Sequence, residues 1–178
     1  MRSKLAQVWV ETVIYTLIAL ILIGTVLAFA KPKIEQLQDK ALIEQSLEIM
    51  DSINSNVLNV VQGGPGNKRV IDIGLKKGSI TIDGPSKMVY FKLEGTRSMY
   101  SEPGAAVMVG DVNVTTIKKA GNYDVTLTDS YPNYEIMYNG NPAGVKTVTK
   151  APNPYKFVIL NNGTDPTTGL LQINFEII

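Results

Sequence analysis

The sequence predicts an α+β protein in which a long N-terminal hydrophobic helix precedes an antiparallel β-sandwich. Two observations predict this class. Hydrophobic residues form an uncharged run near the N-terminus and then recur every three or four positions up to Gln62. From Lys68 onward, apolar and polar residues alternate with a period of two, between turns rich in Gly, Asn, Pro and Asp. The patterns meet at Gly63–Lys68, where GGPGNK breaks the helix.

The first part of the predicted helix is long and apolar enough to cross a membrane. Thr12–Ala30 carries no charge. As a helix it would span roughly 29 Å at about 1.5 Å per residue, close to the thickness of a bilayer's hydrocarbon core. A secretory signal has a shorter apolar core of about 7–15 residues, so a membrane anchor is the better interpretation. Glu11 stands directly before this run and is its one carboxylate neighbour.

The second part of the predicted helix has one apolar stripe and one polar face. The stripe consists of Ile43, Leu47, Met50, Val57 and Val61, with Ile53 beside it. The opposite, exposed face is expected to hold Glu35, Gln36, Gln38, Asp39 and Lys40. Pro32 lacks a backbone donor and is expected to kink the helix at the membrane surface.

About eight or nine short strands are expected after the glycine break. They lie in RVIDIGL, SITIDG, KMVYFKLEG, AAVMVGDVNVTTI, NYDVTLTDSY, NYEIMYNG, VKTVTK, YKFVILNNG and LLQINFEII. The linker KKG between the first two segments predicts a hairpin. The last segment runs to Ile178, which places the C-terminus in a sheet. The strands are expected to provide their own two-layer core; the alternative is that the stripe of the helix completes it.

Composition argues against most catalytic and metal-binding chemistry. The chain has no Cys and no His, which removes the commonest nucleophile–base pairs and transition-metal ligands. Its carboxylates are scattered, and GGPGNK lacks the spacing of a phosphate loop and follows a helix instead of a strand. The net charge is +1, so no basic surface favours nucleic acid. We expect no enzymatic activity, no cofactor, no metal site and no nucleic-acid partner.

The N-terminal segment RSKLAQVWVETVIYTLIALILIG resembles the class III signal peptide and polymerisation helix of archaeal type IV pilin-like proteins. Arg2 and Lys4 match the basic leader of that family, and Ala6 matches the small residue after which a prepilin peptidase cuts. Gln7 would then be the first mature residue. Glu11 would be the fifth, where the family often carries a glutamate. In the family, a Lys-Gly pair is most typical where this chain has leucine and alanine before the cut.

The resemblance implies a division into three parts. Residues 1–6 would be a cleaved leader, residues 7–62 the transmembrane and polymerisation helix, and residues 68–178 an immunoglobulin-like β-sandwich head. The precursor would sit in the cell membrane as a single-pass protein and then join an extracellular filament, a helical homopolymer that could serve surface adhesion. Its partners would be the prepilin peptidase, the membrane before assembly, and other copies of itself. The alternative is an uncleaved single-span membrane protein whose extracytoplasmic β-sandwich binds a ligand.

The resemblance also suggests a role for Glu11. Cleavage after Ala6 would create a cationic α-amine on Gln7, which Glu11 of a neighbouring subunit could meet in the filament. The alternative is that Glu11 lies at headgroup depth and snorkels to water. Two candidate N-glycosylation sequons occur, at Asn113 and Asn162, and Asn162 is the better acceptor because it is expected in a turn.

Overall fold

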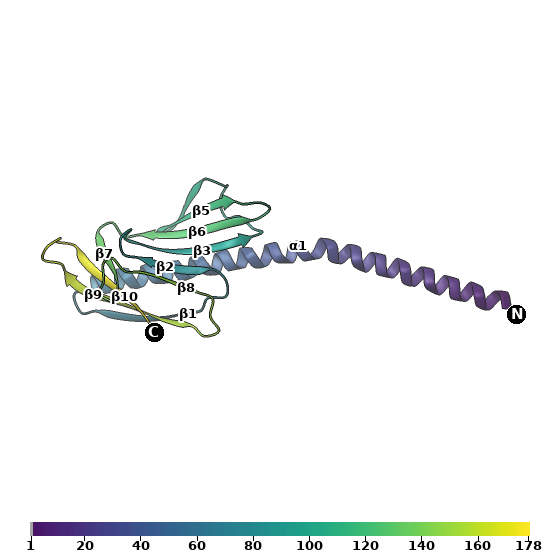
Figure 1. Cartoon of the computed structure of the whole chain (residues 1–178), viewed down its shortest axis with the longest axis horizontal. Coiled ribbons are helices and arrows are strands. Elements are labelled where there is room, and N and C mark those ends of the chain that lie inside the picture. The colour runs from purple at the N-terminus through teal and green to yellow at the C-terminus, as the bar shows by residue number, and fades with distance from the viewer. Residues whose placement is uncertain (1) are drawn as a thin grey trace. The chain divides into compact units, whose positions relative to one another are not determined.

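The computed structural model describes the backbone of residues 2–178 and the side chains of residues 8–178. Over this range it contains one helix and ten strands (Figure 1). The elements are α1 (Arg2–Gln62), β1 (Lys68–Ile73), β2 (Ser79–Asp83), β3 (Met88–Thr96), β4 (Ala106–Val109), β5 (Val112–Lys118), β6 (Tyr123–Ser130), β7 (Tyr134–Tyr138), β8 (Val145–Thr149), β9 (Tyr155–Thr164) and β10 (Leu171–Ile177). The predicted α+β class, with a long N-terminal helix before antiparallel-rich sheets, is confirmed.

The chain forms two compact units that divide α1 between them. The first ends at Gln38 and contains the N-terminal part of α1, and the second covers Asp39–Ile178 and contains the rest of α1 with all ten strands. The helix continues through Pro32 without a break in its secondary structure. The predicted kink at this proline stays a prediction. We refer below to Asp39–Ile178 as the head.

The strands of the head form two sheets. One has four strands in the order β1-β9-β10-β7, and the other has six in the order β4-β5-β6-β3-β2-β8. All pairings are antiparallel except that of β7 with β10, which is parallel. The immunoglobulin-like arrangement of the strands stays a prediction. Backbone hydrogen bonds between Lys156 and Ile178 hold the last residue at the edge of β9.

The head has one hydrophobic core, and the helix supplies part of it. The helical residues that are fully buried are Ile43, Met50, Ile53, Val57 and Val60. They fall three or four positions apart and therefore share one face of the helix. The stripe is shifted slightly from the predicted one, since Leu47 and Val61 are only half-buried at its margins. Of the two predicted arrangements of the core, the structure has the one that the helix completes.

Asp39 was expected on the exposed face of the helix, and this prediction is wrong. Its side chain is buried, at the N-terminal end of the buried stripe. One carboxylate oxygen accepts a hydrogen bond from the Lys77 ammonium at 2.9 Å, and the other accepts one from the Arg97 backbone N–H at 2.7 Å. A buried carboxylate is stable only when it is paired in this way. Asp39 thus joins the start of the head to the loops after β1 and β3.

Two predictions about the strands are also wrong. β1 and β2 do not form a hairpin, since β1 pairs with β9 and β2 pairs with β3 and β8, in different sheets. The segment AAVMVGDVNVTTI forms two strands instead of one, because the chain turns at Gly110 and Asp111 so that β4 pairs with β5. Gly110 has a φ of 59°, a left-handed conformation that glycine adopts without strain.

Candidate functional site

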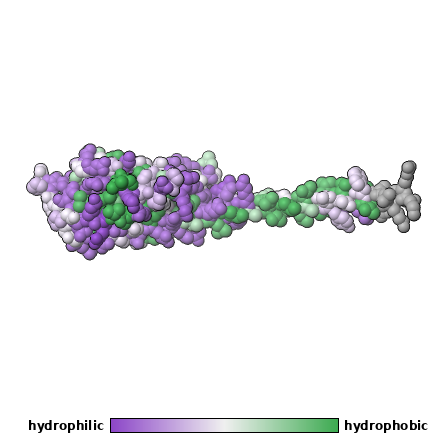
Figure 2. Space-filling model, turned by 90° about the horizontal axis from the view of Figure 1, so that it is seen from below, coloured by the Kyte–Doolittle hydropathy of each residue, from purple (hydrophilic) through white to green (hydrophobic). Residues whose placement is uncertain are grey.

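The apolar part of α1 exposes its hydrophobic side chains on every side. Exposure is highest at Trp9, Tyr15 and Phe29, and the large hydrophobic residues from Val8 to Phe29 are all exposed. In Figure 2 the visible face of this segment is mostly hydrophobic. Among the described residues it is the one helical segment long and apolar enough to span a membrane. A helix that is hydrophobic all round needs an apolar environment, which is lipid or other protein.

The hydroxyl groups within this segment are satisfied by the helix itself. Thr12 donates to the carbonyl of Val8 at 2.9 Å, and Thr25 donates to that of Ile21 at 2.8 Å. Thr16 donates in the same way to the Thr12 carbonyl. A threonine that bonds back to the carbonyl four residues earlier needs no water. The threonines are therefore compatible with an environment without water, and they leave Glu11 as the charged group of the segment.

Glu11 lies on an apolar face of α1. Residues three, four and seven positions further along a helix share a face, and here these are Ile14, Tyr15 and Ile18, all exposed. Within residues 8–178, no hydrogen bond or ion pair involves the Glu11 carboxylate. An unpaired carboxylate in a low-dielectric environment is costly and commonly has a partner. The geometry leaves this carboxylate free for a partner outside the described residues.

The predicted processing residues lie at the limit of what the structure describes. The backbone of Ala6 and Gln7 belongs to α1, but their side chains are outside the described residues. The structure therefore places Glu11 one helical turn after Gln7 in the same helix and leaves the cleavage site as a prediction.

The two candidate glycosylation residues have different environments. Asn162 is exposed near the end of β9, where the pairing with β10 skips it as a β-bulge. Asn113 is half-buried in β5 between β4 and β6, and its Oδ1 is buried without a hydrogen-bond partner. Asn162 was expected in a turn and lies instead in a strand, but its exposure agrees with its choice as the better acceptor.

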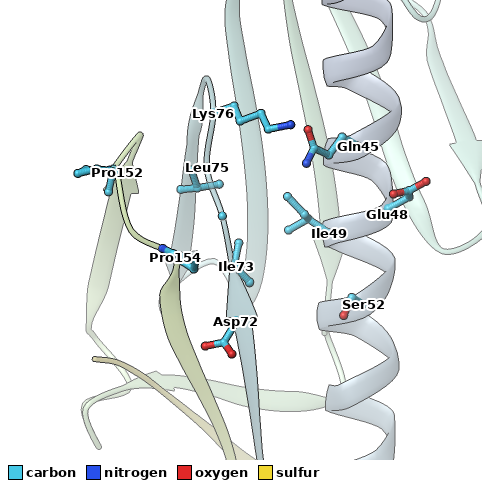
Figure 3. Close-up of a pocket in the computed structure, with 12 residues that line it drawn as sticks. Gln45, Glu48, Ile49, Ser52, Asp72, Ile73, Leu75, Lys76, Pro152 and Pro154 are labelled. Atoms are coloured by element: carbon cyan, nitrogen blue, oxygen red, sulfur yellow. The ribbon is translucent and has the colours of Figure 1, made fainter.

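One cavity of the head is an open groove beside α1. It has a volume of about 440 Å³. Figure 3 shows Gln45 and Ile49 on the helix side, facing Ile73 and Leu75 across the space. Two prolines of the loop after β8 and several charged side chains complete the rim. The groove lacks a cluster of reactive groups, and the described residues contain no group of three or more acidic side chains that could hold a metal ion.

Sequence reasoning missed a cluster of acidic and aromatic groups around Asp129. Asp129 is the second-last residue of β6, on the buried side of the strand. It is only 2% exposed, and neither carboxylate oxygen has a hydrogen-bond partner. Burial raises its pKa to about 7, and the charges of Asp111 and Asp51 add to the shift. Burial likewise raises the pKa of Tyr131, with a further contribution from Asp129. The alternation of buried Val125 and Leu127 with polar neighbours could have placed Asp129 inside.

Comparison with protein-family models, with curated proteins and with solved structures finds no match for this chain.

Proposed function

We propose that this protein is the subunit of an extracellular type IV pilus-like filament, polymerised through the N-terminal part of α1. The observation that carries the proposal is the segment Val8–Phe29, whose large apolar side chains are all exposed and which has Glu11 as its one charge. Such a surface is covered either by lipid or by copies of the same helix. A filament subunit needs both, first in the membrane and then in the assembled polymer.

In this proposal, the Glu11 charge makes assembly more favourable than staying in the membrane. In lipid, its carboxylate costs up to about 2.5–3.5 kcal/mol at the bilayer centre and less near the surface. Removal of residues 1–6 by a prepilin peptidase gives Gln7 a cationic α-amine, a matching partner for a carboxylate on a neighbouring copy. Pairing the two charges in a bundle of helices lowers the cost of both. The role is structural and needs no catalytic group.

The second candidate is an uncleaved single-span anchor with a ligand-binding head. The open groove beside α1 favours it, because apolar side chains and charged rim residues meet there (Figure 3). This candidate keeps residues 1–6 and leaves the N-terminal part of α1 in lipid permanently. Glu11 would then extend toward the headgroups and have no role in assembly.

The two candidates are separated by the mature N-terminus and by microscopy of sheared cell surfaces. The filament proposal expects a chain that begins at Gln7 and filaments that contain it. Ala6→Phe is the matched control, because a bulky side chain should not enter the peptidase site. That variant should keep its leader and form no filaments. Filaments made of uncleaved chains, or a wild-type chain that retains residues 1–6, would contradict the proposal.

A further inference from the structure

The sequence contains two Asn-Gly dipeptides, Asn139-Gly140 and Asn162-Gly163, and both asparagines are exposed. Such a dipeptide is especially prone to deamidation, because glycine has no side chain to keep its backbone nitrogen away from the amide carbon of the preceding asparagine. Sequence and exposure alone would make both positions labile. In both, however, the glycine N–H is bonded to the side chain of another asparagine.

Asn139-Gly140 is the tip of a tight turn after β7. Its φ angles of 50° and 74° are both positive, as in a type I′ turn, and the backbones of Tyr138 and Asn141 close the turn with two hydrogen bonds of 3.1 Å. The Gly140 N–H takes no part in that closure and donates to Oδ1 of Asn174 at 2.7 Å. Asn174 lies in β10 and is only 4% exposed. The turn is therefore bonded to a buried acceptor on the neighbouring strand.

The second dipeptide has the same arrangement within β9. The pairing of β9 with β10 skips Asn162, and the N–H of Gly163 donates to Oδ1 of Asn161 at 2.8 Å. Asn161 is fully buried, and Gly163 has a φ of 90°. The two dipeptides lie in different elements and share no residue. A buried asparagine oxygen thus binds the glycine N–H at each of two independent places.

The partners of each buried amide fix which of its ends faces the glycine. Nδ2 of Asn174 donates to the Glu176 carboxylate at 3.1 Å, and Nδ2 of Asn161 donates to the Val60 carbonyl at 2.9 Å. Carbonyl and ionised carboxylate oxygens only accept hydrogen bonds. Turning either amide round would therefore bring two acceptors together at one end and two donors together at the other. Each Oδ1 is committed to the glycine N–H.

Deamidation uses the same glycine nitrogen as its nucleophile. The nitrogen gives up its proton and forms a bond to Cγ of the preceding asparagine, while the bond from Cγ to the side-chain nitrogen breaks and ammonia leaves. Water then opens the cyclic imide to aspartate or isoaspartate. An amide oxygen is too weak a base to take the proton, and turning the nitrogen toward Cγ would leave a buried acceptor without its donor, which is costly. The hydrogen bond therefore opposes the first step.

We propose that Asn139 and Asn162 are the deamidation sites of this chain, and that Asn174 and Asn161 protect them by binding the glycine N–H groups. The two protecting asparagines are positioning residues, since they act through the glycine nitrogen. The inference is independent of the filament function, because every contact lies within one head. Isoaspartate at Asn162 would add a methylene group to the backbone of β9, which pairs with β1 and β10, so protection at this site preserves the four-stranded sheet.

The test follows deamidation of the full-length chain in detergent micelles, made in a host without N-glycosylation and kept in mildly alkaline buffer. Peptide mass spectrometry measures the fraction of each asparagine converted to an acid. Asn174→Leu removes the acceptor at similar size, and Asn174→Asp keeps an oxygen acceptor while losing the same donor to Glu176. We expect Asn139 to deamidate about fivefold faster in Asn174→Leu, the factor for one ordinary hydrogen bond. Its rate should stay near wild type in Asn174→Asp, and the Asn162 rate, the internal control, should be unchanged in both.

Three results with the variants would overturn the proposal. An unchanged Asn139 rate in Asn174→Leu would show that the rigidity of the fold alone protects the turn. Equal acceleration at Asn139 and Asn162 would show that the variant acts by loosening the whole head. An Asn139 rate as high in Asn174→Asp as in Asn174→Leu would show that the acceptor oxygen is not what protects.

Two measurements on the wild-type chain need no variant and keep the proposal testable if Asn174→Leu does not fold. In urea, Asn139 and Asn162 should deamidate before the other asparagines, and a different order would refute their assignment as the labile sites. In the folded chain, the amide protons of Gly140 and Gly163 should exchange with solvent far more slowly than that of Gly121, an exposed glycine between β5 and β6. Exchange of Gly140 as fast as that of Gly121 would overturn its protection by Asn174.

Discussion

Removing the helix from the head should abolish folding of the strands. Five helical side chains are fully buried in the core of the head: Ile43, Met50, Ile53, Val57 and Val60. Burying such a side chain contributes about 1.5–3 kcal/mol, so the five together contribute roughly 8–15 kcal/mol. A whole domain is stable by only about 5–15 kcal/mol. For a fragment of residues 68–178, the lost burial free energy is therefore as large as the whole free energy of unfolding of a typical domain.

The loss of polar contacts adds to that cost. Asn161 is fully buried in β9, and its amide donates to the Val60 carbonyl at 2.9 Å near the C-terminal end of α1. Without the helix, this donor loses its protein partner, and the net loss of one such hydrogen bond costs about 0.5–1.5 kcal/mol. Asn54 and Asp39 likewise bond to the loops of the six-stranded sheet from the helix side.

The comparison is between fragments 39–178 and 68–178, by thermal unfolding followed with circular dichroism and by the spread of amide NMR signals. The longer fragment should unfold cooperatively, and the shorter one should show no cooperative transition. In the longer fragment, Ile53→Ala should lower the free energy of unfolding by about 2–5 kcal/mol. Leu58→Ala is the matched control on the exposed side and should cost far less. A shorter fragment that melts within a few degrees of the longer one would refute the reasoning.

Three further predictions concern a buried acid, the assembly residue and the sequons. Asp129 has a pKa of about 7 in the folded state against an ordinary value of 3.8, so the folded state binds its proton more tightly, and stability should fall as pH rises from about 4 to 7 and then level off. The full effect is about 4 kcal/mol, at about 1.4 kcal/mol per pKa unit; Asp129→Asn should flatten the curve of melting temperature against pH, and parallel curves for the two proteins would contradict the assignment. Glu11→Gln and Glu11→Leu should both insert into the membrane and be cleaved after Ala6. At equal levels of processed subunit they should give few or no filaments, because the incoming copy no longer attracts the amine. Wild-type filament numbers in Glu11→Leu would instead support snorkelling. In a host that glycosylates exported proteins, Asn162→Gln should remove a glycan mass that Asn113→Gln leaves in place, and the reverse pattern would show that strand burial does not control access.

The class of the fold could be predicted because each half of the chain has a strong local pattern. The pairing of the strands could not, because partners far apart in sequence determine it. The linker KKG looks like a hairpin turn, yet Gly78 is needed for another reason. Its φ is 86°, and a side-chain Cβ there would lie 2.6 Å from the Lys92 carbonyl oxygen of β3. Gly78 is thus needed where the chain entering β2 comes close to β3. β1 pairs with β9 and not with β2.

Buried charges were the second thing that local patterns could not reveal. Asp39 looks like one of several polar residues on an exposed helical face, and only Lys77 and the Arg97 backbone, both distant in sequence, make its burial possible. Glu11 could be found from the sequence because a charge beside an apolar run is conspicuous. Asp129 was harder to find, because its significance depends on α1 and the β4–β5 hairpin packing near it.

The two parts of α1 have different surfaces, and the difference bears on assembly. From Asp39 onward, one stripe of the helix is buried by strands of the same chain. From Val8 to Phe29 the large apolar side chains are exposed on every side, and the described part of the chain covers none of them. Lipid can cover this surface, but lipid offers the Glu11 carboxylate no counter-charge. Under the proposed function, copies of the same helix also cover it and bring the α-amine of Gln7 to each carboxylate. In that case, burial of the apolar surface contributes a similar free energy in the membrane and in the filament. Pairing of the Glu11 charge then makes the filament the more stable state.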